Sequence, residues 1–366
     1  MSTSMLARLG RPQIAFLATG LVMLADAREL HAHVKWFAPY SVAQTPQPIA
    51  ATLANPYFWS GLALALGFFL SARMLEKTGF GAAITYVLDR VTEPVWRHHD
   101  HLMAAVIGAF LVAIFTMGGV YLTPDLKTGS ELVSWMQLGL AATMLGRRTW
   151  WIGGLGILML WVLALAQYPL FHLIDYLALG LGIALFLIVS AGGGERASTL
   201  GLAALRWGLA LSLMWSSLEK FAYPGWFDPL VDAKPFLTFG LPREVFVPMA
   251  GVAEFTLGFG LVSTPLVRRL SALALLVVFN AAVYPFGRLD LVGHALLIAM
   301  MVSVAADRTP AAVRAARPVG RLAAVPGGLA VALVIFSLGY WGLHGLFYGQ
   351  TYEPHPTETR QSAMAG

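Results

Sequence analysis

The chain has no cysteine among its 366 residues and little charge, since only 12% of its residues are Asp, Glu, Lys or Arg. The lack of cysteine excludes disulfides, thiolate metal sites and cysteine-ligated iron–sulfur clusters carried by this chain. The low charge excludes an ordinary water-exposed globule, in which about 25% of residues are charged. A sequence that is 58% hydrophobic instead predicts a protein that faces lipid over much of its surface.

Long apolar runs approach the roughly 20 residues that a helix needs to cross the hydrocarbon core of a bilayer. These runs are rich in Leu, Ala, Gly and Val and lack a period-two alternation, which favours helices over a transmembrane barrel. The sequence therefore predicts an all-α, polytopic membrane protein with the bilayer as its main partner. About eleven spans are expected, at 12–30, 57–75, 102–121, 130–146, 149–167, 171–190, 199–218, 244–263, 268–286, 289–305 and 325–347.

Lys and Arg residues in the loops predict the orientation, because short cytoplasmic loops are enriched in them. More of these residues fall in inner segments if the N-terminus is cytoplasmic, so the C-terminus is expected outside. The net charge of +5 follows from this bias, and no nucleic-acid partner is expected. A cleaved signal peptide is a competing interpretation of the first span, since Arg8 and Arg11 precede an apolar run that ends near Ala25-Asp26-Ala27.

Two parts of the chain share a series of short motifs at similar spacings, which predicts an internal duplication. The first part contains Trp36-Phe37-Ala38-Pro39, Leu66-Gly67-Phe68-Phe69-Leu70, Val120-Tyr121 and Glu131. The second part contains Trp226-Phe227-Asp228-Pro229, Leu257-Gly258-Phe259-Gly260-Leu261, Val283-Tyr284 and His294. We expect two parallel four-helix repeats, because both parts begin on the same side of the membrane.

This duplication predicts four segments along the chain. Residues 1–148 form a first bundle, which carries an insertion at 76–101 that reads as an amphipathic helix on the inner membrane surface or as a partner-binding helix. Residues 149–198 form a helical hairpin, and residues 199–308 form the second bundle. Residues 309–366 supply a basic link, a last transmembrane helix and an outer tail.

Ionisable residues inside a bilayer are costly, so each is a candidate for function. In the second bundle these are Glu254, His294, Arg206 and, at the outer rim, Lys220. If Glu254, His294 and Lys220 converge on one pocket, they could exchange protons as quinone reduction or proton-coupled transport requires. The alternative is a structural network in which Glu254 is neutral or paired with Arg206 or His294.

Aromatic residues gather near Lys220 in the sequence, among them Tyr223, Trp226 and Phe227. They would suit a flat, lipid-soluble ligand at the headgroup level. They equally suit an ordinary belt of interfacial aromatic residues.

Two histidine clusters are candidates for metal binding. His31 and His33 would point the same way in an extended segment and could hold one Cu or Zn ion, although two ligands leave the site incomplete. His172, Asp175, His344 and His355 are the candidates to complete it. The cluster at 98–101 favours a solvated helix start capped by Asp100 over a metal site.

The second part resembles the DoxX family of four-helix membrane proteins over about 200–306. The resemblance is carried by Arg206, Lys220 before Pro224-Gly225-Trp226-Phe227, Glu254 with the Leu257–Leu261 motif, Arg268-Arg269, Pro285 and Gly293-His294. The first part is less similar, because it lacks counterparts of Arg206 and Glu254. The resemblance implies a bacterial inner-membrane protein associated with redox processes, whose namesake is similar to a subunit of a thiosulfate:quinone oxidoreductase.

The expected function is that of a membrane component of a quinone-linked redox system, with a soluble or membrane oxidoreductase as partner. A permease for a small solute or metal ion is one alternative. A membrane anchor that recruits a soluble oxidoreductase is another. No nucleotide-binding loop, nucleophile elbow or HExxH motif is present in the sequence, which argues against ATP-driven transport, α/β-hydrolase chemistry and zincin-type proteolysis.

Overall fold

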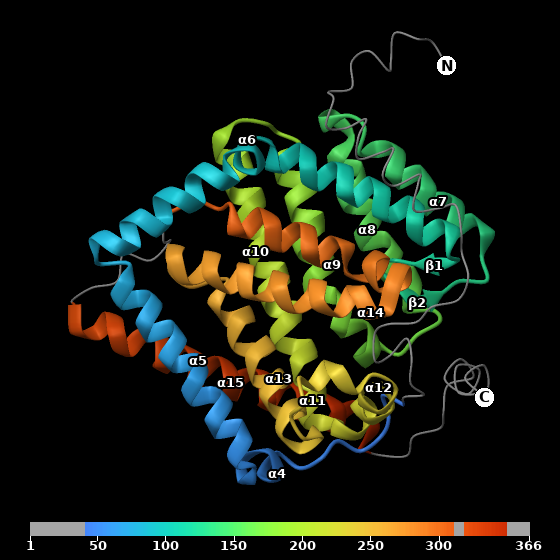
Figure 1. Cartoon of the computed structure of the whole chain (residues 1–366). Helices are drawn as coiled ribbons and strands as arrows, with labels where there is room; N and C mark the ends of the chain where they lie inside the picture. Colours follow the sequence, from blue (N-terminus) through green and yellow to red (C-terminus); the bar gives the residue numbers. More distant parts are fainter. Residues whose placement is uncertain (1–40, 311–317, 350–366) are drawn as a thin grey trace.

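Helices account for most of residues 41–310 and 318–349, which the computed structural model describes (Figure 1). The first half contains α4 Ile49–Ala54, α5 Pro56–Leu75, α6 Gly79–Thr116, β1 Gly119–Val120, β2 Thr123–Lys127, α7 Glu131–Thr143, η1 Arg147–Thr149, α8 Trp150–Ala164 and α9 Leu170–Ser190. The second half contains α10 Glu195–Ser217, α11 Glu219–Ala222, η2 Pro224–Phe227, α12 Asp228–Ala233, η3 Pro235–Thr238, α13 Arg243–Gly260, α14 Pro265–Ala305 and α15 Pro318–Tyr348.

Six helical segments of the described chain are long and apolar enough to cross a membrane, fewer than the eleven expected. They are Pro56–Leu75, Gly79–Thr116, Leu170–Ser190, Glu195–Ala222, Pro265–Val283 and Ala324–Tyr348, with Leu289–Ala305 as a shorter apolar helix. The helices α7 and α8 have only 13 and 15 residues, which at 1.5 Å per residue is too short for a core of about 30 Å. The span predicted at 12–30 lies outside the described residues.

The segment predicted as an insertion is part of one continuous helix. Thr78 begins α6 by accepting a hydrogen bond from the Gly81 amide at 3.1 Å, and the helix then runs for 38 residues with Pro94 inside it. The predicted helix start at Asp100 is therefore wrong, because Asp100 lies in the middle of α6. Across the top of the molecule in Figure 1, α6 extends from α5 to the neighbourhood of α7.

The end of the predicted span 102–121 is not helical. After Thr116 the chain turns and forms the antiparallel pair β1–β2, with positive φ at Gly118 and Tyr121. Glycine tolerates this left-handed conformation and is typical of turns. This hairpin is a small β element in a chain that is otherwise helical in its described parts.

The helix α14 is itself a hairpin of two helical limbs. Gly287 has φ 75° and ψ −149° and reverses the chain, a backbone conformation that is essentially restricted to glycine. The Nε of Arg269 on the first limb donates a hydrogen bond to the carbonyl oxygen of Ala305 at the end of the second limb, at 2.8 Å. The two limbs therefore lie side by side, as Figure 1 also shows.

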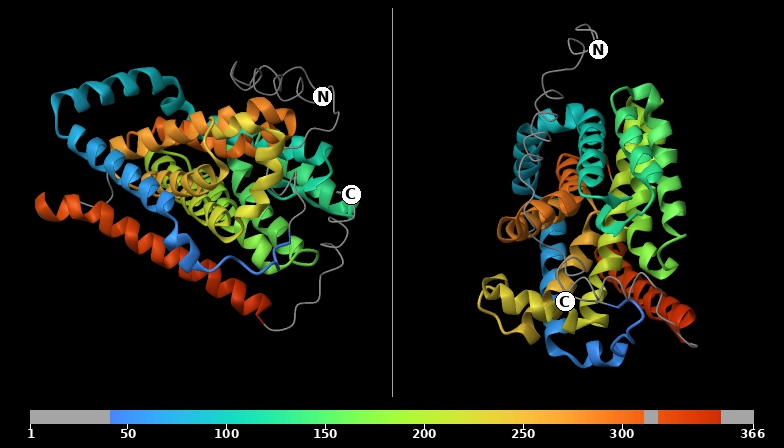
Figure 2. Two further views of the ribbon diagram at one scale, coloured as in Figure 1. Left: turned by 60° about the horizontal axis from the view of Figure 1, so that its bottom comes forward. Right: turned by 90° about the vertical axis from the view of Figure 1, so that its right-hand side faces the viewer.

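The helices α9 and α10 approach each other very closely. A Cβ added to Gly182 on α9 would lie 2.7 Å from the Cα of Gly208 on α10, so these two backbones are in direct contact. Small residues at such crossings allow helices to associate in lipid, where apolar burial supplies little driving force. The helix α15 lies along α5 on the outside of the molecule (Figure 2).

The structure does not support the predicted repeat. Gly67 is exposed on α5 with no atom within 4 Å of the place that a Cβ would take, whereas Gly258 is buried on α13 against α10. Val120-Tyr121 lies in the β hairpin, whereas Val283-Tyr284 lies within α14. Trp36 lies outside the described residues. The matching motifs thus occupy different structural settings.

Candidate functional site

The strongest candidate site is an ion pair between α11 and α13. Nζ of Lys220 lies 2.6 Å from Oε2 of Glu254, and the side chains are 14% and 21% exposed. Nζ also lies 5.0 Å from the ring centroid of Phe227, within the range of a cation–π interaction. Both charges therefore sit at the edge of the protein interior, where each stabilises the charge of the other.

Gly251 allows this pair to form. It lies one helical turn before Glu254, and a Cβ there would be 3.1 Å from the Cβ of Lys220 and 2.8 Å from the ring of Phe221. The absence of a side chain lets the backbone of α11 rest on α13. The structural alternative predicted from the sequence paired Glu254 with Arg206 or His294. In the structure Glu254 pairs with Lys220 instead.

The aromatic residues beside this pair pack on one another. The rings of Tyr223 and Trp226 stack with centroids 4.0 Å apart and planes 10° apart, and Trp226 donates a hydrogen bond from Nε1 to Oε1 of Gln44 at 2.8 Å. The two residues are only 2% and 5% exposed. The rings of Tyr223 and Trp226 stack directly on each other and are almost fully buried. A flat ligand would therefore contact Phe227, which is partly buried, before it reached Tyr223 or Trp226.

His294 has a different partner from the one expected. Its Nδ1 lies 3.0 Å from Oδ2 of Asp290, one helical turn earlier on the second limb of α14. The edge of the His294 ring also packs against Phe279 on the first limb, with ring centroids 5.0 Å apart. The structure thus brings Lys220 and Glu254 together as one pair and holds His294 in another.

Arg206 belongs to a third group of charges, at the junction of α10 with both ends of α14. Its Nη1 lies 2.5 Å from Oδ2 of Asp307, and Nη1 of Arg268 lies 2.8 Å from the same oxygen. Asp307 and Arg268 are 0% and 1% exposed. Oδ1 of Asp307 accepts hydrogen bonds from the backbone and hydroxyl of Thr309. This deeply buried arrangement of two arginines around one carboxylate is typical of a structural ion-pair network.

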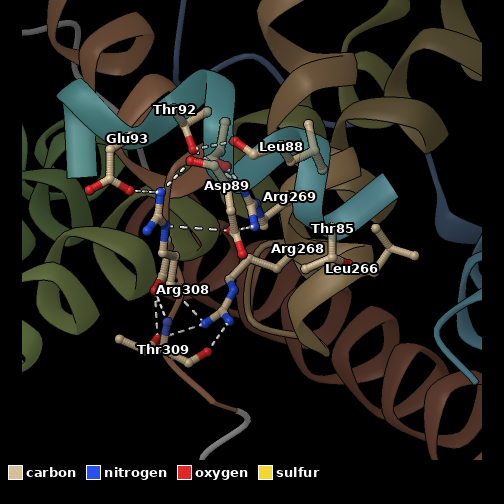
Figure 3. A network of polar contacts seen from close by, with 12 residues as sticks. Thr85, Leu88, Asp89, Thr92, Glu93, Leu266, Arg268, Arg269, Arg308 and Thr309 are labelled. Carbon is tan, nitrogen blue, oxygen red and sulfur yellow. Dashed lines mark hydrogen bonds and ion pairs between the residues drawn. The ribbon is translucent and has the colours of Figure 1, made fainter. Parts of the chain in front are cut away.

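The network continues to α6, as Figure 3 shows. From the first limb of α14, Nη1 of Arg269 donates to Oδ1 of Asp89 at 2.5 Å and Nη2 donates to the hydroxyl of Thr92 at 3.2 Å. Arg308 pairs with Glu93 and donates to the carbonyl oxygen of Asp89. These hydrogen bonds join residues 177 to 219 positions apart in sequence, and they fix α6 on the α14 hairpin.

The histidine cluster in α6 is also part of a polar contact between helices. Nη2 of Arg147 donates to Oδ2 of Asp100 at 2.9 Å, and the hydroxyl of Ser198 lies 2.9 Å from Nε2 of His99 and donates to Oδ1 of Asp100. His99 and Asp100 are both buried. The cluster therefore joins α6 to η1 and to the start of α10, and it is not a solvated helix start.

His31 and His33, the predicted metal ligands, lie outside the described residues, as does His355. Within 41–310 and 318–349 no group of three or more His, Cys, Asp or Glu side chains could hold a metal ion. Three of the side chains proposed to complete that site contact different neighbours: His172 lies 3.7 Å from Asp125, Asp175 accepts a bond from Trp215, and His344 packs on Phe171.

Sequence analysis did not identify Asp89, Asp290 or Asp307 as members of these groups. Asp290 could have been found, because its spacing of four from His294 places both on one helix face. The partners of Asp89 and Asp307 carry no such local signal. Comparison of the chain with protein-family models, with curated proteins and with solved structures finds no match.

Proposed function

We propose that this integral membrane protein is the membrane component of a quinone-linked redox system, and that Lys220 and Glu254 contact the quinone. The observation that carries the proposal is the partly exposed Lys220–Glu254 pair next to the ring of Phe227. The several long apolar helices are consistent with a membrane protein. The resemblance of 200–306 to the DoxX family supports a redox role and a place in a bacterial inner membrane. The excess of Lys and Arg in the inner segments supports a cytoplasmic N-terminus.

The chemistry of the pair fits such a ligand. An ammonium group has three donors and no acceptor, so Lys220 can donate to a carbonyl oxygen while it keeps its bond to Glu254. The carboxyl group of Glu254 can accept or donate a proton, depending on its charge state. Reduction of a quinone consumes two electrons and two protons, and the electrons would come from an oxidoreductase partner. The ring of Phe227 supplies a flat apolar surface beside the two polar groups.

Binding of a short-chain quinone to the purified protein in lipid nanodiscs tests the proposal. We expect Lys220→Met and Glu254→Gln each to weaken binding by roughly tenfold or more, the scale expected for a lost hydrogen bond to a charged group. Lys234→Met and Glu244→Gln are matched controls, because Lys234 also lies over a ring, that of Phe286, and Glu244 is an exposed residue of the same helix as Glu254. Equal binding by all four variants would remove the site from this position.

The alternative functions predict different results for the purified protein. A permease for a small solute or metal ion would show solute flux in proteoliposomes without any redox change. An anchor would retain a soluble oxidoreductase on the membrane while failing to bind quinone. Either result would replace the quinone-linked function.

A further inference from the structure

The first half of α6, residues 79–97, lies at the base of the α14 hairpin. Arg269, near the start of the first limb, pairs there with Asp89. Arg308, just after the second limb, pairs with Glu93 (Figure 3). The first limb contains a candidate membrane span and the second a shorter apolar helix, so the base of the hairpin marks one surface of the membrane. Residues 79–97 therefore lie close to that surface.

The helix α6 is too long to cross a membrane over its whole length. Its 38 residues extend over about 57 Å at 1.5 Å per residue, whereas the hydrocarbon core is about 30 Å thick. Residues 98–116 contain a single Asp, Glu, Lys or Arg, which is Asp100. The charged residues of 79–97 are Asp89, Arg90, Glu93 and Arg97. The second half thus suits the bilayer interior, and the first half, which lies on the outside of the molecule in Figure 2, suits its surface.

The two faces of residues 79–97 differ in chemistry. Phe80, Val87 and Val91 are seven and four residues apart, so they share one face of the helix. Their side chains are between 57% and 72% exposed, so this face points away from the rest of the protein. Asp89 lies on the opposite face and contacts α14. The segment turns an acidic group inward and apolar groups outward, the reverse of a surface helix on a water-soluble protein.

Basic residues border the apolar face. Arg90 is exposed beside Val91, and Lys77 is exposed just before the helix. In the part of the chain that the structure describes, neither forms an ion pair with an acidic side chain. The acidic residues nearby pair with other arginines, in Arg73–Glu76, Asp89–Arg269 and Glu93–Arg308. The outward face is therefore apolar with positive edges, which complements a surface of anionic lipids.

We propose that residues 79–97 form a lipid-binding helix that lies in the headgroup region of one leaflet and recognises anionic phospholipids. Phe80, Val87 and Val91 enter the boundary between headgroups and acyl chains, to a depth of about 5–10 Å. Lys77 and Arg90 contact the lipid phosphates. The sequence alone left a protein partner as the other occupant of this segment, and its place at the base of two apolar limbs favours lipid. The proposal requires a membrane but does not depend on quinone binding.

Spin labels on single-cysteine variants of the full-length protein test the depth, and the absence of native cysteine makes the labelling specific. Labels at Val87→Cys and Val91→Cys are measured in phosphatidylglycerol nanodiscs, as the accessibility of the nitroxide to oxygen and to a water-soluble nickel chelate. Leu338→Cys, exposed within a candidate span of α15, is the lipid reference. Asp232→Cys, exposed on α12, is the water reference. We expect both α6 labels to lie between the two references.

Removal of charge tests the recognition of anionic lipid. We expect the double variant Lys77→Gln/Arg90→Gln to move the label at Val91→Cys towards water by several Å. Replacement of phosphatidylglycerol by phosphatidylcholine should have the same effect on the protein with both charges. Arg148→Gln is the matched control, because it removes an exposed charge outside the segment and should leave the depth of the label unchanged.

Three results would overturn the proposal. Nickel accessibility at both α6 labels equal to that of Asp232→Cys would place this face in water, where it is open to a protein partner. Accessibility equal to that of Leu338→Cys would make the whole of α6 a tilted span. Equal depths in the two lipids would remove the recognition of anionic headgroups. Quinone binding should be unchanged in the double variant, which leaves Lys220 and Glu254 intact, so failure here is distinguishable from failure of the proposed function.

Discussion

Arg206 and Asp307 are 101 residues apart in sequence and are joined at 2.5 Å in a site from which solvent is excluded. Arg206 lies near the middle of α10, and Asp307 directly follows the second limb of α14. The pair therefore fixes the end of the α14 hairpin against the middle of α10. It does so together with Arg268, which shares the same carboxylate oxygen.

Replacing Asp307 by Asn should destabilise the protein severely. The amide keeps the shape of the side chain but leaves the charges of Arg206 and Arg268 without a carboxylate, and breaking a buried pair costs about 3–5 kcal/mol. Unfolding in mixed micelles of increasing SDS fraction measures the change. Asp232→Asn is the control, since Asp232 is 65% exposed in its contact with Arg243, and such surface pairs contribute about 1 kcal/mol or less. Equal unfolding of the two variants would contradict the role assigned to Asp307.

Replacing Gly182 by Ala should separate α9 from α10. The added methyl group would lie 2.7 Å from the Cα of Gly208 and 2.9 Å from the carbonyl oxygen of Ala204, and these backbone atoms cannot rotate away. Overpacking of this kind costs about 1–3 kcal/mol. Gly67→Ala is the control, because no atom lies near that position and alanine favours helix by about 1 kcal/mol. The same SDS titration should show a loss for the first variant and no loss for the second.

The helical character of the chain could be predicted because it depends on local composition. The apolar segments that form α5, α9 and α15 could be predicted from hydropathy alone. The span predicted at 102–121 ended too late, because the helix stops at Thr116. The adjacent glycines Gly118 and Gly119 are a turn signal that marks this end. The spans predicted at 130–146 and 149–167 contain shorter helices than expected, because turns around Leu145–Thr149 and Ala166–Pro169 interrupt them.

The charged residues within the predicted spans could be picked out from the sequence, but most of their partners could not. Lys220 and Glu254 lie on neighbouring elements, and both were candidates. Arg206 pairs with Asp307, which lies just after 289–305, the last span predicted for the second bundle. A single sequence contains no information on which distant carboxylate will neutralise a buried arginine, because many pairings satisfy the same charge balance.

Replacing Asp89 by Ala should release the first part of α6 from the α14 hairpin. Arg269 would lose its hydrogen bond to the Asp89 carboxylate, and Arg308 would lose its ion pair of 3.5 Å with the same oxygen while keeping its bond to the carbonyl oxygen of residue 89. We expect amide hydrogen exchange over 79–93 to be faster by roughly tenfold, the effect of about one lost hydrogen bond to a charged group. Arg97→Ala removes an ion pair within α6 itself, to Glu93, and should leave the exchange rates at 79–93 nearly unchanged. Similar rates in wild type and Asp89→Ala would show that apolar packing alone holds α6.

Alkaline pH should weaken the attachment of the β hairpin through Tyr168. Its hydroxyl donates to the carbonyl oxygen of Lys127 at 3.0 Å and accepts from the backbone amide of Lys127 at 2.6 Å, and burial raises the pKa of Tyr168 above its ordinary value. The unfolded chain therefore loses this proton first, near pH 10, while the folded chain retains it. Because the folded state then binds more protons, stability falls as the pH rises from about 10 towards the raised pKa.

Thermal unfolding in detergent between about pH 8 and pH 11, a range that brackets the ordinary pKa of tyrosine, measures this effect. Tyr168→Phe should be less stable than wild type near pH 8, by about 1–3 kcal/mol, because the amide of Lys127 loses its partner. The difference between the two proteins should shrink as the pH rises, since the variant lacks this ionisation. Tyr86→Phe is the control, because Tyr86 is 63% exposed, and its difference from wild type should not depend on pH. A constant difference for Tyr168→Phe across the range would show that its hydroxyl ionises equally in the folded and unfolded chains.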